Sequence, residues 1–143
     1  MKKTVSLLLI IIMLFCLNAC GNISDTYGDI SEAVTPEYSS DIHSKEDIET
    51  AIEVAKDYFK KEFEGCKLLI ITYGGDDLLH SHTDSTESGK EEDVIVLESS
   101  FYVSPNGGDG SLNQDYTYTG WKWIIVKDAD GNWIGFDADM AKA

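Results

Sequence analysis

The stretch that decides the fold is residues 44–73, SKEDIETAIEVAKDYFKKEFEGCKLLIITY, where a helical pattern gives way to a strand pattern. From residue 45 to about residue 64, apolar side chains recur at the three- and four-residue spacing of an amphipathic helix: Ile48, Ile52, Ala55, Phe59 and Phe63. Ser44 and Asp47 form a Ser-x-x-Asp capping signal at the start of this segment, and Gly65 is a typical helix stop. We therefore expect one long helix whose wide apolar stripe lies on a broad surface.

Downstream of the helix the apolar pattern changes to the period of strands, with polar or glycine-rich segments between the runs. We expect four strands, at Cys66 to Tyr73, Asp93 to Val103, Tyr116 to Lys127 and Asn132 to Asp137. The segment at 127–133, KDADGNW, contains an Asp-Gly pair that is typical of a tight hairpin turn. The predicted fold class is α+β, with one long N-terminal amphipathic helix packed across a twisted, mainly antiparallel sheet of about four strands.

The first residues have the pattern of an export signal. Two lysines precede an apolar run of about a dozen residues at positions 5–17, which is too short for a membrane span of roughly 20 residues. The sequence at 17–20, Leu-Asn-Ala-Cys, resembles the lipobox of bacterial lipoproteins, in which the chain is cut before the cysteine and the thiol carries a diacylglycerol. We predict a lipoprotein signal peptide at residues 1–19 and lipidation of Cys20, which places the chain on the extracytoplasmic face of the cell membrane. The alternative is an ordinary secretory signal, with Cys20 free or paired.

The segment at residues 20–43 is acidic and lacks a sustained apolar period. After the cysteine it holds five acidic residues and no lysine. Such a composition is typical of a disordered tether, because too few apolar side chains are present to offset the entropy of ordering the chain. We therefore predict a tether at residues 20–43 and a single α+β domain at residues 44–143.

The composition is strongly acidic and excludes one class of partner. Once residues 1–19 are removed, nine lysines and no arginine stand against 26 acidic residues. Nucleic acid is not an expected partner, because its phosphates need a positive surface. The commonest role of such acidity is to keep a domain soluble and away from anionic head groups, and a cationic ligand is the less common alternative.

Cysteine usage gives no disulfide framework. Cys16 lies in the predicted signal peptide and Cys20 carries the predicted lipid, which leaves Cys66 alone. Cys66 sits between the helix stop at Gly65 and an apolar run, and no histidine lies close to it in the sequence. We expect Cys66 to be a small core side chain and not a catalytic thiol.

Two groups of polar side chains resemble metal sites, and both have a simpler explanation. His80 and His82 lie among aspartates at residues 76–92, but the composition of this segment favours a loop that covers a groove or is mobile. Residues 128–139 place oxygen donors at four positions of a calcium-loop template, but a tryptophan stands where the template needs glycine. A hairpin turn explains these residues better. No metal site and no cofactor are predicted.

Aromatic residues in the strands raise the question of which rings form the core and which line a site. Strand alternation puts Glu98 and Tyr102 on one face of the second strand and Tyr118 on the same face of the third. Trp123 falls on the other, more apolar face. One helix covers only one face of the sheet. The other face carries both polar and apolar side chains, and its residues Glu98, Tyr102 and Tyr118 form the candidate ligand-binding surface. Alternatively, these tyrosines pack at the sheet edge with their hydroxyls in water.

Three quoted segments carry a resemblance to a known class of protein. They are SKEDIETAIEVAKDYFKKEFEGCKLLIITYGGD, DVIVLESSF and GGDGSLNQDYTYTGWKWIIVKDADGNW, within residues 42–136. Together they resemble the small uncharacterised lipoprotein domains of low-GC Gram-positive bacteria, whose architecture is similar to nuclear transport factor 2-like and cystatin-like folds. The resemblance implies a fold and a location, and it brings no activity or catalytic residues with it.

The leading hypothesis is a lipid-anchored extracytoplasmic binding or interaction domain without catalytic activity. Besides the membrane that holds its lipid, its partner would be an unknown envelope protein or small molecule. The runner-up is a small-molecule enzyme or pocket protein of the nuclear transport factor 2-like type, in which an Asp/His pair lies in an apolar pocket. All three histidines lie outside the predicted helix and strands, which favours the binding hypothesis. A structural role at an interface is the third alternative.

Overall fold

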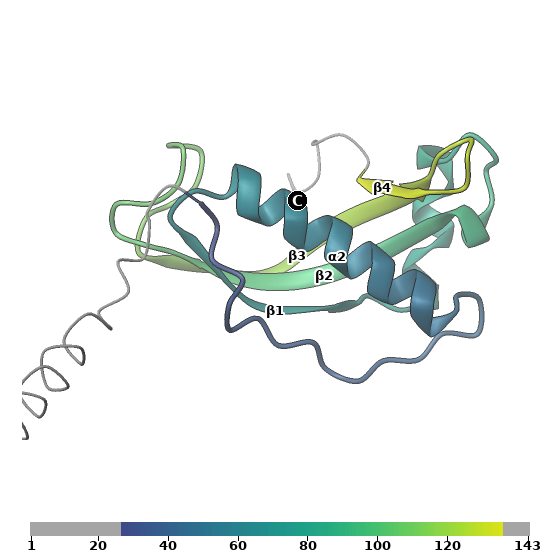
Figure 1. The fold of residues 1–143 in the computed structure, drawn as a ribbon, viewed down its shortest axis with the longest axis horizontal. Helices are drawn as coiled ribbons and strands as arrows, with labels where there is room; N and C mark the ends of the chain where they lie inside the picture. Colours follow the sequence, from purple (N-terminus) through teal and green to yellow (C-terminus); the bar gives the residue numbers. More distant parts are fainter. Residues whose placement is uncertain (1–26, 136–143) are drawn as a thin grey trace, which may run out of the picture.

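A computed structural model of the chain describes residues 27–135. Within them, one helix lies across one face of a four-stranded sheet of order β1-β2-β3-β4, in which all neighbours are antiparallel (Figure 1). The α+β class, the packed helix and the antiparallel sheet are therefore confirmed. The predicted signal peptide at residues 1–19 and the lipidation site at Cys20 lie outside the described residues.

Helix α2 spans Lys45–Glu62, close to the predicted limits. Its first turn is capped as the sequence indicates, since the Ser44 hydroxyl accepts a hydrogen bond of 3.1 Å from the backbone N–H of Asp47. One face of the helix is buried, through Ile48, Ala51, Ile52, Ala55 and Phe59. The chain then turns at Gly65, whose φ of +66° favours glycine, and a Cβ there would lie 2.4 Å from the Cα of Gly107.

The strands fall where the sequence predicts them, to within a residue at most ends: β1 Cys66–Tyr73, β2 Val94–Val103, β3 Tyr116–Lys127 and β4 Trp133–Gly135. The turn between β3 and β4 is held by Asp128, whose carboxylate accepts hydrogen bonds from the backbone N–H groups of Asp130 and Asn132. This confirms the hairpin turn predicted at residues 127–133. The predicted end of the last strand, at Asp137, lies outside the described residues.

β3 carries one extra residue relative to β2. Trp121 of β3 pairs with Ser99 of β2. Tyr118, three residues earlier on β3, pairs with Phe101, only two residues later on β2. The extra residue forms a bulge at Gly120, whose φ of +67° favours glycine. Because residues directly opposite each other share a face, the bulge places Tyr118 on the face that holds Phe101, and the predicted alternation is wrong at this point.

The main core lies between α2 and the sheet face that α2 covers. Its centre is aromatic: the ring of Phe63 lies 5.2 Å from that of Phe101 and 5.4 Å from that of Trp123. Phe59 stacks on Phe63 at 4.7 Å. The indole N–H of Trp123 donates a hydrogen bond of 2.8 Å to the hydroxyl of Ser99, so the polar group of this buried ring is satisfied.

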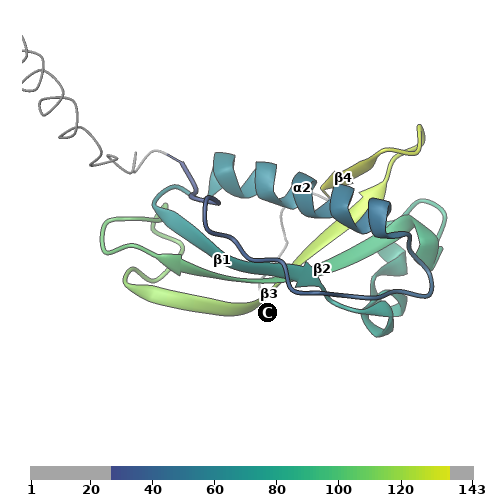
Figure 2. The same cartoon turned by 60° about the horizontal axis from the view of Figure 1, so that its bottom comes forward.

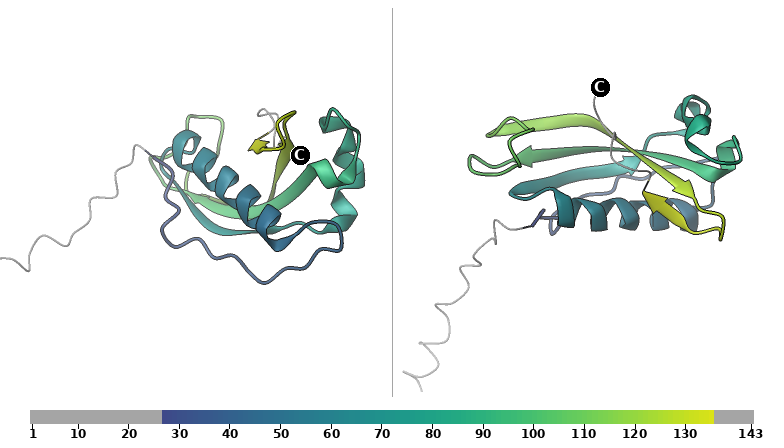
Figure 3. Two further views of the ribbon diagram at one scale, coloured as in Figure 1. Left: turned by 45° about the vertical axis from the view of Figure 1, so that its right-hand side comes forward. Right: turned by 90° about the horizontal axis from the view of Figure 1, so that it is seen from above.

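Three short 3₁₀ turns cover one end of the opposite sheet face: η1 Asp76–Leu78, η2 His80–Ser85 and η3 Glu91–Asp93. Figure 3 shows these turns on the side of the sheet away from α2. Leu79, between the first two turns, is fully buried, and so are Val94 and Val96 of β2. The segment predicted as a polar loop at residues 76–92 therefore shields the apolar end of that face from water.

Residues 28–43, which we call the strap, run along the outer edge of β1 and then return to the start of α2 (Figure 2). At Asp29 and again at Val34, the strap backbone donates to and accepts from β1, with N···O distances of 2.8–3.0 Å. The prediction of a disordered tether is therefore wrong for residues 28–43, and the domain begins before Ser44. Backbone hydrogen bonds to a sheet edge require no apolar period, which is why composition did not indicate them.

Candidate functional site

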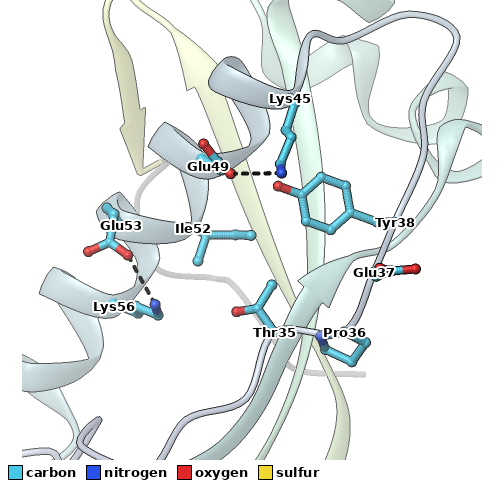
Figure 4. Close-up of a pocket in the computed structure, with 9 residues that line it drawn as sticks. All are labelled: Thr35, Pro36, Glu37, Tyr38, Lys45, Glu49, Ile52, Glu53 and Lys56. Carbon is cyan, nitrogen blue, oxygen red and sulfur yellow. Dashed lines mark hydrogen bonds and ion pairs between the residues drawn. The ribbon is translucent and has the colours of Figure 1, made fainter.

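The strap and α2 leave a groove of about 700 Å³ between them (Figure 4). Its lining comes from both elements: Thr35, Pro36, Glu37 and Tyr38 of the strap, and Lys45, Glu49, Ile52, Glu53 and Lys56 of α2. The groove exists because the strap leaves the edge of β1 after Val34 and is next held at Ser40. No hydrogen bond joins the backbone of residues 35–39 to another described residue. The backbone of this part of the strap is therefore bonded only at its two ends, and the Tyr38 side chain supplies its packing contact with the core.

The floor of the groove is apolar. Ile52 of α2 is only 3% exposed, and Figure 4 shows the Tyr38 ring reaching from the strap toward α2. The same ring packs edge-on against Tyr73 of β1, with 6.4 Å between ring centroids. Burial and the nearby Glu49 carboxylate raise the pKa of the Tyr38 phenol, which therefore stays neutral at physiological pH.

Charged side chains of α2 stand at both ends of the groove. Lys45 pairs with Glu49 at 3.6 Å at one end, and Lys56 pairs with Glu53 at 3.0 Å at the other. The lysines differ in exposure, since the Lys45 side chain is 80% exposed and the Lys56 side chain only 19%. Figure 4 shows Glu37, on the strap, directed away from α2. An apolar floor between ionised ends suits a ligand that has both an apolar part and a polar or charged group.

Asp76 fixes the second end of the strap. Its carboxylate accepts hydrogen bonds from the Ser40 hydroxyl at 2.5 Å and from the backbone N–H of Asp41 at 2.9 Å. It also accepts a hydrogen bond of 2.6 Å from the Tyr73 hydroxyl. Burial opposes ionisation of this carboxyl, but the hydrogen bonds outweigh burial and lower the pKa of Asp76. The position of the strap over the groove thus depends on one ionised carboxylate.

His43, at the end of the strap, is a buried histidine that the sequence did not single out. Its ring lies edge-on to Tyr73 at 6.2 Å and to Trp133 at 5.7 Å, and its Nε2 is buried without a hydrogen-bond partner among the described residues. Burial lowers the pKa of His43, against a hydrogen bond with the backbone of Val94 and the charges of Asp47 and Asp76. The available signal was its place directly before the helix cap, where a side chain often packs on the first turns of the helix.

The three side chains predicted to form a binding surface are not brought together. Glu98 and Tyr102 lie on the sheet face that α2 leaves open, and the Tyr102 hydroxyl donates a hydrogen bond of 2.7 Å to Asp115. Tyr118 lies on the opposite face and stacks on Phe101, with 5.3 Å between ring centroids. The bulge in β3 is the physical reason for this difference. The grouping of Tyr118 with Glu98 and Tyr102 is therefore corrected.

Cys66 is the core side chain that the sequence predicts. It is buried, its Sγ lies 3.6 Å from the carbonyl oxygen of Glu64, and burial raises the pKa of its thiol to about 11. His80 is exposed in η2, where its Nδ1 lies 3.2 Å from a carboxylate oxygen of Glu91. Across residues 27–135, no group of three or more His, Cys, Asp or Glu side chains is arranged to hold a metal ion.

Comparison with known proteins adds no relative from which a role could be transferred. No family model, no curated protein and no solved structure matches the chain. In the part of the chain that the structure describes, no helix is both long and apolar enough to cross a membrane. Function has to be inferred from the groove and its lining.

Proposed function

We propose that the chain is a lipid-anchored extracytoplasmic binding domain and that the groove between the strap and α2 holds its ligand. The observation that carries this proposal is the groove itself, with about 700 Å³ of space, an apolar floor and ionised ends. Ligand sites in proteins have volumes of about 300–1,000 Å³, and this groove falls within that range, although it is more highly charged than most such sites. The groove is therefore large enough for a small molecule or a short peptide segment.

The chemistry of the lining supports binding over catalysis. A general acid or base needs a pKa near the working pH, and a nucleophile needs an activating partner. The lining holds glutamates paired with lysines, and its phenol, Tyr38, has a raised pKa. His43 and Cys66, which are buried elsewhere, do not belong to it. The residues of the groove thus supply contacts and charge rather than reacting groups.

The lipid anchor in this proposal rests on the sequence at residues 17–20. The strap is bonded to β1 from Asp29 onward, so eight residues separate Cys20 from the first bonded residue of the edge. The nine steps of extended chain from Cys20 to Asp29 span at most about 32 Å. An anchored domain would therefore stay close to the membrane surface, where its groove would meet ligands of the cell envelope.

Blocking the groove tests its role. The mature chain, with Cys20→Ser to leave it unlipidated, is screened against small organic ligands by NMR, and amide shifts of Thr35, Glu37 and Tyr38 and of residues 49–56 report binding. Thr35→Trp places a large ring at the groove and should abolish these shifts. Thr117→Trp, at an exposed position of β3, is the matched control and should leave them unchanged. Ligands that still shift the groove amides in Thr35→Trp, or that bind only elsewhere, would refute the proposal.

The anchor is tested separately in cells. Cys20→Ala should abolish labelling by a radioactive or clickable fatty acid, and it should leave the chain unprocessed or released from the membrane. Membrane fractionation and mass spectrometry of the N-terminal peptide report both effects. An unchanged, lipid-labelled and membrane-bound Cys20→Ala protein would remove the anchor from the proposal and leave the groove untouched.

A further inference from the structure

The groove already holds a cation of its own chain at one end. The Nζ of Lys45 lies 3.6 Å from Glu49, and its charge lowers the pKa of the Tyr38 phenol against the larger, opposite effect of burial. The two partners are four residues apart on α2, with the lysine first, which is the weaker orientation for such a pair. The Lys45 side chain is 80% exposed and that of Glu49 is 59% exposed, so water screens the pair strongly. Lys45 is therefore held loosely at a point where an ammonium group fits.

The charges around the groove discriminate between ligand classes. Three glutamates and two lysines line it, within a chain of formal net charge −15. An anionic ligand would be repelled by the glutamates and by the chain as a whole. A neutral apolar ligand would remove water from the Lys45–Glu49 pair without offering either group a hydrogen bond, which carries a desolvation cost. A cation would gain the carboxylate of Glu49 as the acceptor of a charge-assisted hydrogen bond.

We propose, building on the groove function above, that the ligand is an organic cation consisting of an ammonium group on an apolar body. Its apolar part lies on Ile52 and Tyr38, in the centre of the groove. Its ammonium group takes the position of the Lys45 Nζ beside Glu49, and Lys45 swings out into solvent. Lys45 is thus a competitor within the chain, and Glu49 is the residue that selects for positive charge.

Three probes of matched size separate the ligand classes: 2-phenylethylammonium, 3-phenylpropionate and 2-phenylethanol. Each is titrated into the mature Cys20→Ser chain at low ionic strength, and the dissociation constant is read from groove amide shifts. We expect 2-phenylethylammonium to bind most tightly, with both other probes at least about fivefold weaker because a charge-assisted hydrogen bond is absent. The affinity for the cation should fall as salt is added.

Two substitutions should act in opposite directions. Lys45→Met removes the competitor and keeps the length of the side chain, so it should tighten binding of 2-phenylethylammonium about twofold, the equivalent of one such helix pair. Glu49→Gln should weaken binding of the cation about fivefold while leaving binding of 2-phenylethanol unchanged. Lys60→Met and Glu62→Gln make the same charge changes on the same helix but lie about 16–20 Å along it from Glu49, beyond the Debye length at physiological salt. Both controls, measured at physiological salt, should leave affinity unchanged.

The outcomes distinguish this inference from the proposed function. Equal or tighter groove binding of the neutral or anionic probe, or no gain from Lys45→Met, would overturn the cation class and leave the groove as a site. Loss of affinity in Glu62→Gln as large as the loss in Glu49→Gln, with both measured at physiological salt, would also overturn it, since only the overall charge would then matter. If Thr35→Trp blocks none of the three probes, both the groove as the ligand site and the cation as its ligand are refuted.

Discussion

The phenol of Tyr73 donates a hydrogen bond of 2.6 Å to the carboxylate of Asp76, so a core residue of β1 orients the acid that holds the strap. The same carboxylate accepts from Ser40 and from the backbone of Asp41. One side of the groove is thereby tied to the sheet through a short chain of hydrogen bonds. Burial and this bond raise the pKa of Tyr73, which keeps the phenol protonated and able to donate.

Asp76→Ala should loosen the strap. The substitution removes the acceptor of three hydrogen bonds, and we expect a loss of about 1–2 kcal/mol in the free energy of unfolding because the site is partly open to water. Amide hydrogen exchange at Asp41, Ile42 and His43, whose N–H groups are bonded to Asp76 or to Ser40, should accelerate more than exchange in β2. Asp77→Ala, at the exposed neighbour, is the control and should change neither quantity. Equal effects of the two variants would show that Asp76 does not hold the strap.

His43 should make stability depend on pH below about 6.5. Burial lowers the pKa of His43 from its ordinary value of 6.5, so the unfolded chain binds a proton at a higher pH than the folded chain. Unfolding therefore takes up a proton in this range, and stability falls as the pH drops from 6.5, whereas above 6.5 this contribution is constant. A hydrogen bond with the backbone of Val94 opposes the shift most, Asp47 and Asp76 also oppose it, and Lys127 adds to it.

His43→Phe tests this dependence because it keeps a ring between Tyr73 and Trp133 but cannot titrate. Urea unfolding between pH 5 and 8 should show a smaller slope of stability against pH in His43→Phe than in the parent chain. His80→Gln, at the exposed histidine, should retain the parent slope. An unchanged slope in His43→Phe would assign the dependence to another group.

Tyr118 should contribute more to stability than Tyr102, although strand alternation in the sequence assigns the two tyrosines to the same face of the sheet. Tyr118 stacks on the buried Phe101 and accepts a hydrogen bond of 2.9 Å from the backbone of Asn113. We expect Tyr118→Ala to cost about 2–3 kcal/mol, toward the lower end for loss of a large packed side chain because the ring is only partly buried. Tyr102→Ala should change stability much less, because its ring lies on the open face. Urea unfolding gives the free energy of unfolding of both variants. A larger loss in Tyr102→Ala than in Tyr118→Ala would contradict the placement of Tyr118 on the core face by the bulge.

The elements with a local period were predictable, and those held by non-local contacts were not. The capping residues Ser44 and Asp47 and the turn at Asp128 act within a few residues of chain, so the sequence shows them directly. The bulge at Gly120 inserts one residue into a regular alternation, and only its glycine hints at it. The sequence therefore predicted the fold class but put Tyr118 on the wrong face.

The groove could not be predicted for a related reason. Its strap has no apolar period, because single side chains such as Ile30 and Tyr38 pack on the core one at a time. The rest of its attachment comes from backbone groups, which every residue carries, and from Asp76, which is distant in sequence. Acidic, irregular composition predicts disorder, and here a sheet edge with unpaired backbone groups overrides that tendency.

The strap should be part of the folding unit, and truncation measures its contribution. A chain that begins at Ser44, the domain start expected from composition, loses the backbone hydrogen bonds of Gly28, Asp29 and Val34 to the helix end and to β1. At about 1 kcal/mol for each of these five bonds, the loss is comparable with the whole stability of a small domain. We expect the chain from Ser44 to unfold at much lower urea or to aggregate, because the edge of β1 is then exposed. A chain that begins at Tyr27 keeps every described contact and should match, in urea midpoint, a chain that begins at residue 20 with Cys20→Ser. If the chain from Ser44 were as stable as the chain from Tyr27, the strap would be an appendage, and the groove that it forms with α2 would have no fixed wall.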